Sequence, residues 1–116
     1  MEEKELIEIA KKAFVLAQQI EGMEEAMNKG EKALAGYRSF AKNFNSILEE
    51  AKKVLGIDQA ILGTISHLNQ YDSNKQRGFS VDFEGIKADL PILKGALKAF
   101  FEFYFPPKEK EKIGFK

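Results

Sequence analysis

The chain has 116 residues, a length that fits one domain, and its 18 Lys and Arg balance 18 Asp and Glu, so the formal net charge is zero. With no Cys and a single His, the composition excludes disulfides, thiolate nucleophiles, Cys-based zinc sites and metal sites built on two imidazoles. Because the chain starts with acidic residues and has no long apolar run, we expect no secretory signal and no membrane span. We therefore expect a cytoplasmic protein.

Two long stretches in the first half repeat apolar residues at steps of three and four, which predicts two amphipathic helices. The first runs from Leu6 to Met27 and ends at the Asn28-Lys29-Gly30 turn, because Asn and Gly tolerate the left-handed conformation that closes a helix. The second runs from Leu34 to Leu55 and ends at Gly56. Its apolar stripe is broad and therefore requires more than one packing neighbour.

A third and shorter helix is expected between the second helix and a polar loop. Asp58 is a good N-cap, and Ile65 and Leu68 follow at helical spacing, so this helix should end near Tyr71. The stretch from Asp72 to Gly78 contains no apolar residue. It cannot contribute to a core and is predicted to be an exposed loop.

The fourth predicted helix begins near Asp82 and is stopped by Pro106-Pro107. The residues just before Phe83 alternate like a strand, but a lone short strand would have no partner, and the later apolar residues step by three and four. Pro91 removes a backbone donor and clashes with the preceding turn. The helix should therefore kink there, or split and restart with Asp89 as its cap.

The predicted fold is an all-α, single-domain, antiparallel up-and-down bundle of four main helices, because short connections make consecutive helices antiparallel neighbours. The bundle should cover residues 1–105, and residues 106–116 should form a charged C-terminal tail. The side chains that we expect in one core are Tyr37, Phe44, Leu48, Leu93, Leu97 and Phe100.

Catalytic groups are scarce in this chain. His67 is adjacent to Ser66, and neighbouring helical side chains point about 100° apart, which is poor geometry for a nucleophile and its base. The pairs Glu24-Glu25 and Glu49-Glu50 have no Glu-x-x-His partner of the kind that di-metal bundles use. We therefore expect a protein that is not an enzyme and that uses no cofactor or metal.

Basic side chains gather where acidic ones are missing. Residues 32–47 contain no acid, and both arginines of the chain, Arg38 and Arg77, belong to the second helix or the polar loop. Guanidinium groups suit bidentate phosphate contacts, so this pattern favours binding to RNA phosphates; the alternative is an ordinary solvated surface. The candidate RNA contacts are Lys32, Arg38, Lys42, Asn45, Lys75 and Arg77.

Aromatic residues crowd the end of the last helix. Five of the six residues 100–105 are aromatic, and consecutive helical positions point all round the helix, whereas one core covers only one side. Phe101, Phe103 and Phe105 are therefore a candidate interface for another protein chain. The alternatives are that Phe103 and Phe105 pack beneath the following tail, or that the rings stack on bases.

Four segments, in this order, carry a resemblance to a known family. They are the opening helix around Leu6–Ala13, the sequence Tyr37-Arg38-Ser39-Phe40, the pair Tyr71 and Arg77, and the closing run Ala96–Tyr104. The closing run has the form Ala-Leu-x-Ala-aromatic-aromatic-x-aromatic-Tyr. Together these segments resemble the small helical subunit of type III-A CRISPR effector complexes, the Csm complexes.

The resemblance implies a non-catalytic subunit of an antiviral, RNA-guided complex. Such a subunit stacks in several copies along the guide RNA, contacts the target RNA backbone, and packs on its own copies and on other effector-complex subunits, while nuclease activity lies elsewhere. The alternative function is a stand-alone helical adaptor module that self-associates through its aromatic C-terminal helix and binds no RNA.

Overall fold

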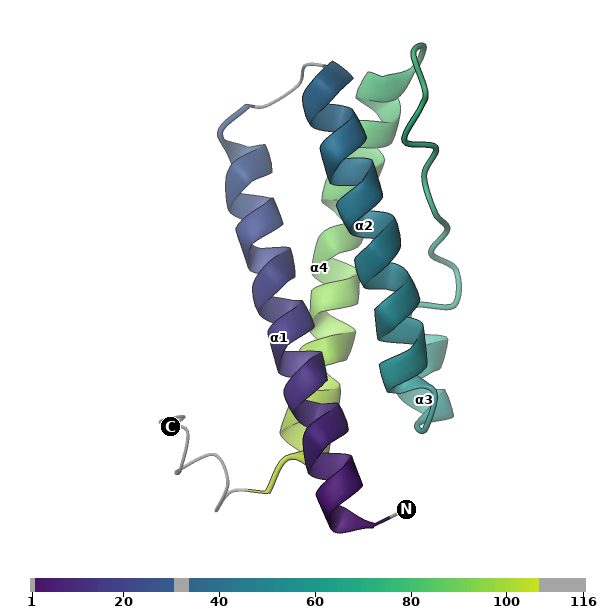
Figure 1. Ribbon diagram of the computed structural model, residues 1–116. Helices are drawn as coiled ribbons and strands as arrows, with labels where there is room; N and C mark the ends of the chain where they lie inside the picture. Colours follow the sequence, from purple (N-terminus) through teal and green to yellow (C-terminus); the bar gives the residue numbers. More distant parts are fainter. Residues whose placement is uncertain (1, 31–33, 107–116) are drawn as a thin grey trace.

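The computed structural model describes residues 2–30 and 34–106. These residues form four helices and no strand: α1 (Glu3–Asn28), α2 (Leu34–Leu55), α3 (Gln59–Gly63) and α4 (Phe79–Tyr104), as Figure 1 shows. The all-α prediction is thereby confirmed for the described residues. Lys32 and the predicted tail beyond Pro106 lie outside them. No described helix has an apolar stretch long enough to cross a bilayer.

α1 and α4 run antiparallel and make the most extensive helix contact of the bundle. Lys94 Nζ lies 2.5 Å from Glu24 Oε1, and Lys98 Nζ lies 2.9 Å from Glu21 Oε1. The residue numbers fall along α1 as they rise along α4, which shows that the two helices are antiparallel. These pairs use acids of the N-terminal helix to neutralise lysines of the C-terminal one. The side chains that α1 buries are Ala10, Ala13, Ala17, Ile20, Met23 and Met27.

α2 and α4, in contrast, run parallel. The ring centroids of Tyr37 and Phe79 are 6.0 Å apart, and those of Phe40 and Phe83 are 5.6 Å apart. The residue numbers along α2 and along α4 therefore rise in the same direction. Figure 1 shows both helices running from the top of the bundle to its base. The second and fourth helices of an up-and-down bundle are parallel as well, so this pair does not decide the topology. The described residues form three long helices and the 5-residue α3, and the antiparallel bundle of four main helices that we expected is therefore not confirmed.

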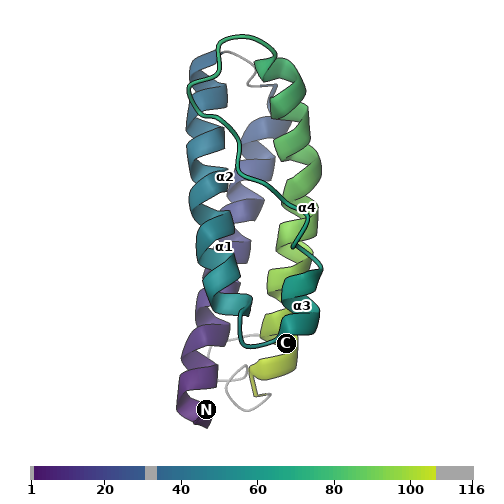
Figure 2. The same ribbon diagram turned by 90° about the vertical axis from the view of Figure 1, so that its right-hand side faces the viewer.

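The third helix is shorter than we expected. Asp58 caps α3 as predicted, with its Oδ1 accepting from the backbone N–H groups of Ala60 and Ile61 at 3.1 and 3.2 Å. However, α3 ends at Gly63, and the hydroxyls of Thr64 and Ser66 donate to carbonyls three residues earlier. Such local bonds compete with helix propagation. Residues 64–78 instead return along α2 and α4 as turns and irregular chain (Figure 2).

Tyr104 links the end of α4 to this cap. Its hydroxyl donates to Asp58 Oδ2 at 2.6 Å, and this bond, with the backbone donors, holds the pKa of Asp58 below its usual value. Replacing Tyr104 by Phe should therefore raise the pKa of Asp58, measured by NMR titration of its carboxyl carbon. Because the folded-state pKa is lowered, Asp58 contributes stability above its unfolded-state pKa, and this contribution is lost as pH falls through the folded-state value. An unchanged pKa in the Phe variant would contradict this contact.

α4 begins at Phe79, earlier than expected, and continues through Pro91 without a break. Gly78 precedes it with φ of +69°, a left-handed conformation that glycine adopts at little cost. A proline inside a helix costs about 3 kcal/mol, but Leu90 and Leu93 are completely buried beside it, and each such burial contributes about 1.5–3 kcal/mol. Packing therefore holds the two halves of α4 together.

The core lies between the three long helices. All six side chains that the sequence assigned to it are buried, with exposed fractions of 0 or 1%. Aromatic rings from α2 and α4 fill much of this space, while α1 contributes mainly small and aliphatic side chains. The structure thus confirms the predicted core, although one of the helices expected around it is replaced by an irregular connection.

Candidate functional site

Tyr71 fastens the irregular connection to both α2 and α4. Its backbone N–H donates to Asn45 Oδ1 and its carbonyl accepts from Asn45 Nδ2, both at 2.7 Å. Its hydroxyl donates to Asp89 Oδ2 at 2.6 Å, and its ring meets Phe44 edge-on with centroids 5.4 Å apart. Burial and the bond to Asp89 raise the pKa of Tyr71 above its usual value. The path of the connection is therefore determined by side chains of two helices.

Tyr37 makes a second attachment closer to the start of α4. Its hydroxyl donates to the Asp72 carbonyl at 2.6 Å and lies 3.3 Å from Asp82 Oδ2. Burial and the negative charge of Asp82 raise the pKa of Tyr37 to about 12, so this hydroxyl stays protonated at neutral pH. Lys75 Nζ binds the same Asp82 oxygen at 2.9 Å. The loop that carries the predicted basic residues is thus anchored at its base.

Three of the predicted basic residues are exposed at this end of the bundle. Arg38 and Lys42 lie on the same stripe of α2 as Asn45, which holds the connection. Arg77 lies two residues before Phe79. The Phe79 ring packs against the ring of Tyr37, which directly precedes Arg38 on α2. Within the described residues, no acidic side chain forms an ion pair with any of these three cations. The fold therefore leaves these cations of α2 and the loop exposed.

Two other members of the predicted set are engaged inside the protein. Asn45 uses both ends of its amide for the Tyr71 backbone, so its amide has a structural role in holding the connection. Lys75 is only partly exposed, and its charge is compensated by Asp82. Both residues were predicted to lie on a polar surface. The sequence around each of them gives no sign of the partner that the fold places beside it.

The aromatic interface prediction is wrong for two of its three residues. Phe101 and Phe105 are 3% and 2% exposed, and their rings stack on each other with centroids 4.7 Å apart. Phe14 of α1 lies 4.9 Å from Phe101, so α1 covers this side of α4. The chain leaves the helix at Phe105, which directs this ring back onto the bundle. Only Phe103 remains exposed, at 77%.

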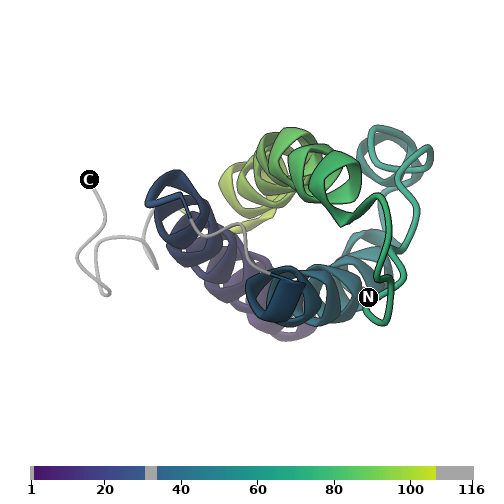
Figure 3. The same cartoon turned by 90° about the horizontal axis from the view of Figure 1, so that it is seen from above.

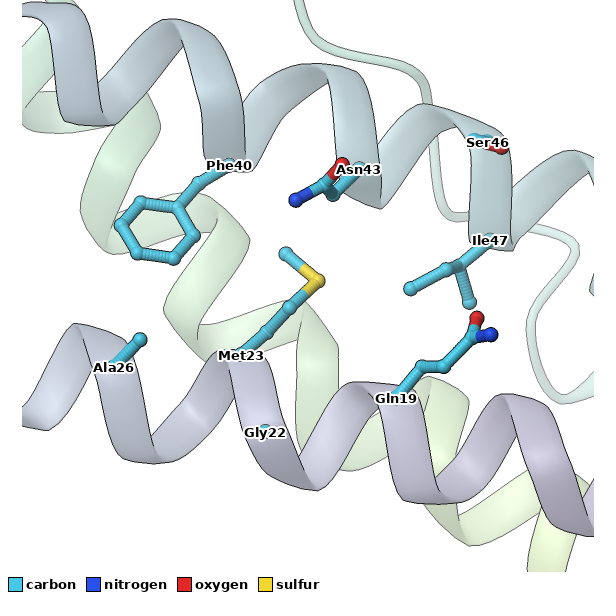
Figure 4. A pocket seen from close by; sticks show the side chains of 8 residues that line it. All are labelled: Gln19, Gly22, Met23, Ala26, Phe40, Asn43, Ser46 and Ile47. Atoms are coloured by element: carbon cyan, nitrogen blue, oxygen red, sulfur yellow. The ribbon is translucent and has the colours of Figure 1, made fainter.

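An open groove of about 520 Å³ separates α1 from α2 on the face away from α4 (Figure 4). In Figure 4, Gln19 and Met23 project from α1 toward Asn43 and Ile47 of α2. The side chains around the groove offer amides and a hydroxyl for hydrogen bonds, but none of them is titratable. The groove is lined by Gln19, Gly22, Met23, Ala26, Phe40, Asn43, Ser46 and Ile47.

The residues considered for catalysis do not converge. His67 is exposed, and the hydroxyl of Ser66 donates to the Gly63 carbonyl at 2.9 Å rather than to an imidazole. Across the described ranges, no three His, Asp or Glu side chains are grouped to hold a metal ion. The expectation that the protein is not an enzyme stays a prediction.

Comparison of the chain with protein-family models, with curated proteins and with solved structures finds no match. The resemblance to the Csm small subunit therefore stays a prediction that rests on the four segments quoted above. The candidate site is the set of exposed cations formed by Arg38 and Lys42 on α2 and Arg77 on the anchored connection.

Proposed function

We propose that this protein is a non-catalytic RNA-contacting subunit that binds backbone phosphates through Arg38, Lys42 and Arg77. The observation that carries the proposal is that these cations are exposed on α2 and on a connection that Tyr71 and Tyr37 attach to the long helices. Guanidinium and ammonium groups bind phosphate oxygens without reading bases, so such contacts position a strand and give no sequence preference.

The resemblance in sequence supports a particular setting for this contact. The subunit would belong to an RNA-guided interference complex of the type III-A CRISPR kind in the cytoplasm, with other effector subunits, copies of itself, and guide and target RNA as partners. The net charge of zero fits a weak contact in each copy. Several copies on one strand would add their contacts through effective concentration.

Replacing Arg38 by Ala should weaken RNA binding by a similar factor for unrelated sequences. Each phosphate neutralised on a single strand contributes about 0.7 to the slope of log affinity against log salt, and the variant should lose roughly that amount. The measurement is fluorescence anisotropy of labelled oligouridine and of a mixed-sequence RNA titrated with the full chain at several salt concentrations. Arg77→Ala should behave in the same way.

Lys12→Ala is the matched control, because Lys12 is an exposed cation of α1 and does not belong to the candidate site. It should leave the salt slope unchanged. If the chain bound neither RNA at low salt, or if Arg38→Ala and Lys12→Ala had equal effects, the proposed RNA contact would be wrong. A loss that depended strongly on RNA sequence would instead indicate base contacts.

A second candidate function is the stand-alone adaptor that self-associates through α4 and binds no RNA. It is favoured by Phe103, a large aromatic side chain with 77% of its surface exposed near the end of α4. Isolated apolar side chains are common on protein surfaces, so this residue alone defines no partner. The RNA titration separates the two functions, since the adaptor should show no salt-dependent RNA binding.

A further inference from the structure

Another hollow lies between α2 and the irregular connection. It is open to solvent and has a volume of about 340 Å³. Figure 3 shows the connection beside α2 and α4 on the side away from α1, so this hollow is separate from the groove between α1 and α2. Leu48 is 1% exposed and gives the hollow an apolar floor. The hollow is lined by Leu48, Glu49, Lys52, Lys53 and Gln70.

The hollow continues the stripe of α2 that carries Arg38 and Lys42. Five positions of α2 follow one another at steps of three or four and therefore share one side of the helix. They are Arg38, Lys42, Asn45, Glu49 and Lys52. The last two of them line the hollow. At a rise of about 1.5 Å per residue, Lys42 and Lys52 are about 15 Å apart along the helix axis, so a strand that follows α2 from Arg38 reaches the hollow.

Gln70 is held at the edge of this hollow by its neighbour in the connection. It directly precedes Tyr71, whose backbone N–H and carbonyl are both bonded to the Asn45 side chain at 2.7 Å. The side-chain amide of Gln70 offers donors and an acceptor, and the Glu49 carboxylate offers acceptors only. An apolar floor with such groups at its rim suits a flat ring with a polar edge. An unpaired base is such a ring, and it forms hydrogen bonds through its edges.

Glu49 is unfavourable for a strand that is held by its phosphates alone, because a carboxylate and a phosphate repel each other. Its side chain is exposed on the same stripe as the cations. A carboxylate accepts from the exocyclic amino group of a base, such as the N4 amino group of cytosine, whereas uracil carries a carbonyl oxygen at that position. Glu49 therefore distinguishes bases between which the cations do not discriminate.

We infer that this hollow binds one unpaired, amino-bearing base of the RNA strand whose phosphates lie on Arg38 and Lys42. The inference rests on the proposed function and deepens it, because it adds one base contact to a strand that is otherwise held by its backbone. Glu49 accepts from the amino group of the base, and Gln70 bonds to the same edge. The cations provide affinity without sequence preference, and Glu49 provides the preference.

Oligocytidine and oligouridine are the matched probes, because their bases are of similar size and differ at the position that Glu49 contacts. Fluorescence anisotropy with the full chain should show that oligocytidine binds about fivefold more tightly, the lower end of the discrimination that paired hydrogen bonds to a base edge provide. Arg38→Ala should weaken the binding of both RNAs by a similar factor and lower the salt slope of both.

Glu49→Gln tests the carboxylate. It removes the repulsion of phosphates, so oligouridine should bind more tightly, and it removes the acceptor for the amino group, so most of the preference for oligocytidine should be lost. A Glu49 side chain that only repelled phosphates would give a different result, because both affinities would rise by the same factor. Glu49 is exposed, so the thermal unfolding of the variant should change little.

Gln70→Ala tests the second polar group of the rim. It should weaken oligocytidine binding about threefold, as expected for the loss of one hydrogen bond. The salt slope should stay unchanged, since no phosphate contact is lost. Gln18→Ala is the matched control, because Gln18 is an exposed glutamine of α1 away from the hollow, and its replacement should leave both affinities unchanged.

The outcomes separate this inference from the proposed RNA contact. Equal affinity of the native chain for the two RNAs, an unchanged preference in Glu49→Gln, or a Gln70→Ala variant that behaves like Gln18→Ala would overturn the base site. A lowered salt slope in Arg38→Ala would in that case still support the phosphate contacts. A chain that bound neither RNA at low salt would overturn both proposals.

Discussion

Replacing Phe44 by Ala is expected to lower the free energy of unfolding by about 3–5 kcal/mol. The ring is completely buried in the middle of α2 and contacts the Tyr71 ring, so its removal leaves a cavity in the core and takes away one support of the irregular connection. Neighbouring rings are themselves held by packing and hydrogen bonds and cannot collapse into the space. Urea unfolding followed by circular dichroism measures the loss.

Phe103→Ala is the matched control for this substitution. It removes the same atoms from the same protein, but from a ring that is 77% exposed, and its effect should stay within about 0.5 kcal/mol. Both variants should be compared at low micromolar concentration, so that any α4 pairing does not contribute. A loss below about 1 kcal/mol for Phe44→Ala would place its ring outside the core.

Helical periodicity predicted the long helices well because it records which side of each helix is buried. α2 begins at Leu34 and ends at Leu55 as expected, and α1 differs from its prediction by a few residues. The same periodicity failed at the third helix. Ile65 and Leu68 are buried as predicted, with exposed fractions of 0 and 2%, but they lie in turns rather than in a helix. Apolar spacing therefore predicted burial there without predicting backbone conformation.

The candidate site shows a different limit of sequence reasoning. The exposure of Arg38 and Lys42 followed from the stripe of α2, which is a local property. The pairing of Asn45 with Tyr71 joins residues that are 26 apart, and no local pattern distinguishes it from a solvated amide. Phe105 was assigned to the surface because the helix was expected to continue through it, whereas the backbone turns there. Contacts that depend on the path of a connection were thus not predictable from spacing.

Two Gly→Ala substitutions should change stability in opposite directions. A Cβ at Gly85 would lie 2.8 Å from the Tyr71 hydroxyl oxygen and 3.2 Å from its ring, and Tyr71 cannot retreat because Asn45 and Asp89 hold it. Gly22 lies inside α1 with nothing within 4 Å of the added atom. Replacing a helical Gly by Ala otherwise gains about 1 kcal/mol.

We expect Gly85→Ala to lower the free energy of unfolding by about 1–3 kcal/mol, because displacing Tyr71 breaks its hydrogen bond to the Asp89 carboxylate, and bonds to charged groups contribute about 1.5–3 kcal/mol. Gly22→Ala should raise it by about 0.5–1 kcal/mol. Urea unfolding of both variants, and of each combined with Tyr71→Phe, measures these changes. In the Tyr71→Phe background the hydroxyl is already absent, so Gly85→Ala should cost less, whereas the effect of Gly22→Ala should be unchanged. If Gly85→Ala stabilised the native chain as much as Gly22→Ala does, Tyr71 would not lie against α4, and the connection that carries Arg77 would not be held where the RNA proposal needs it.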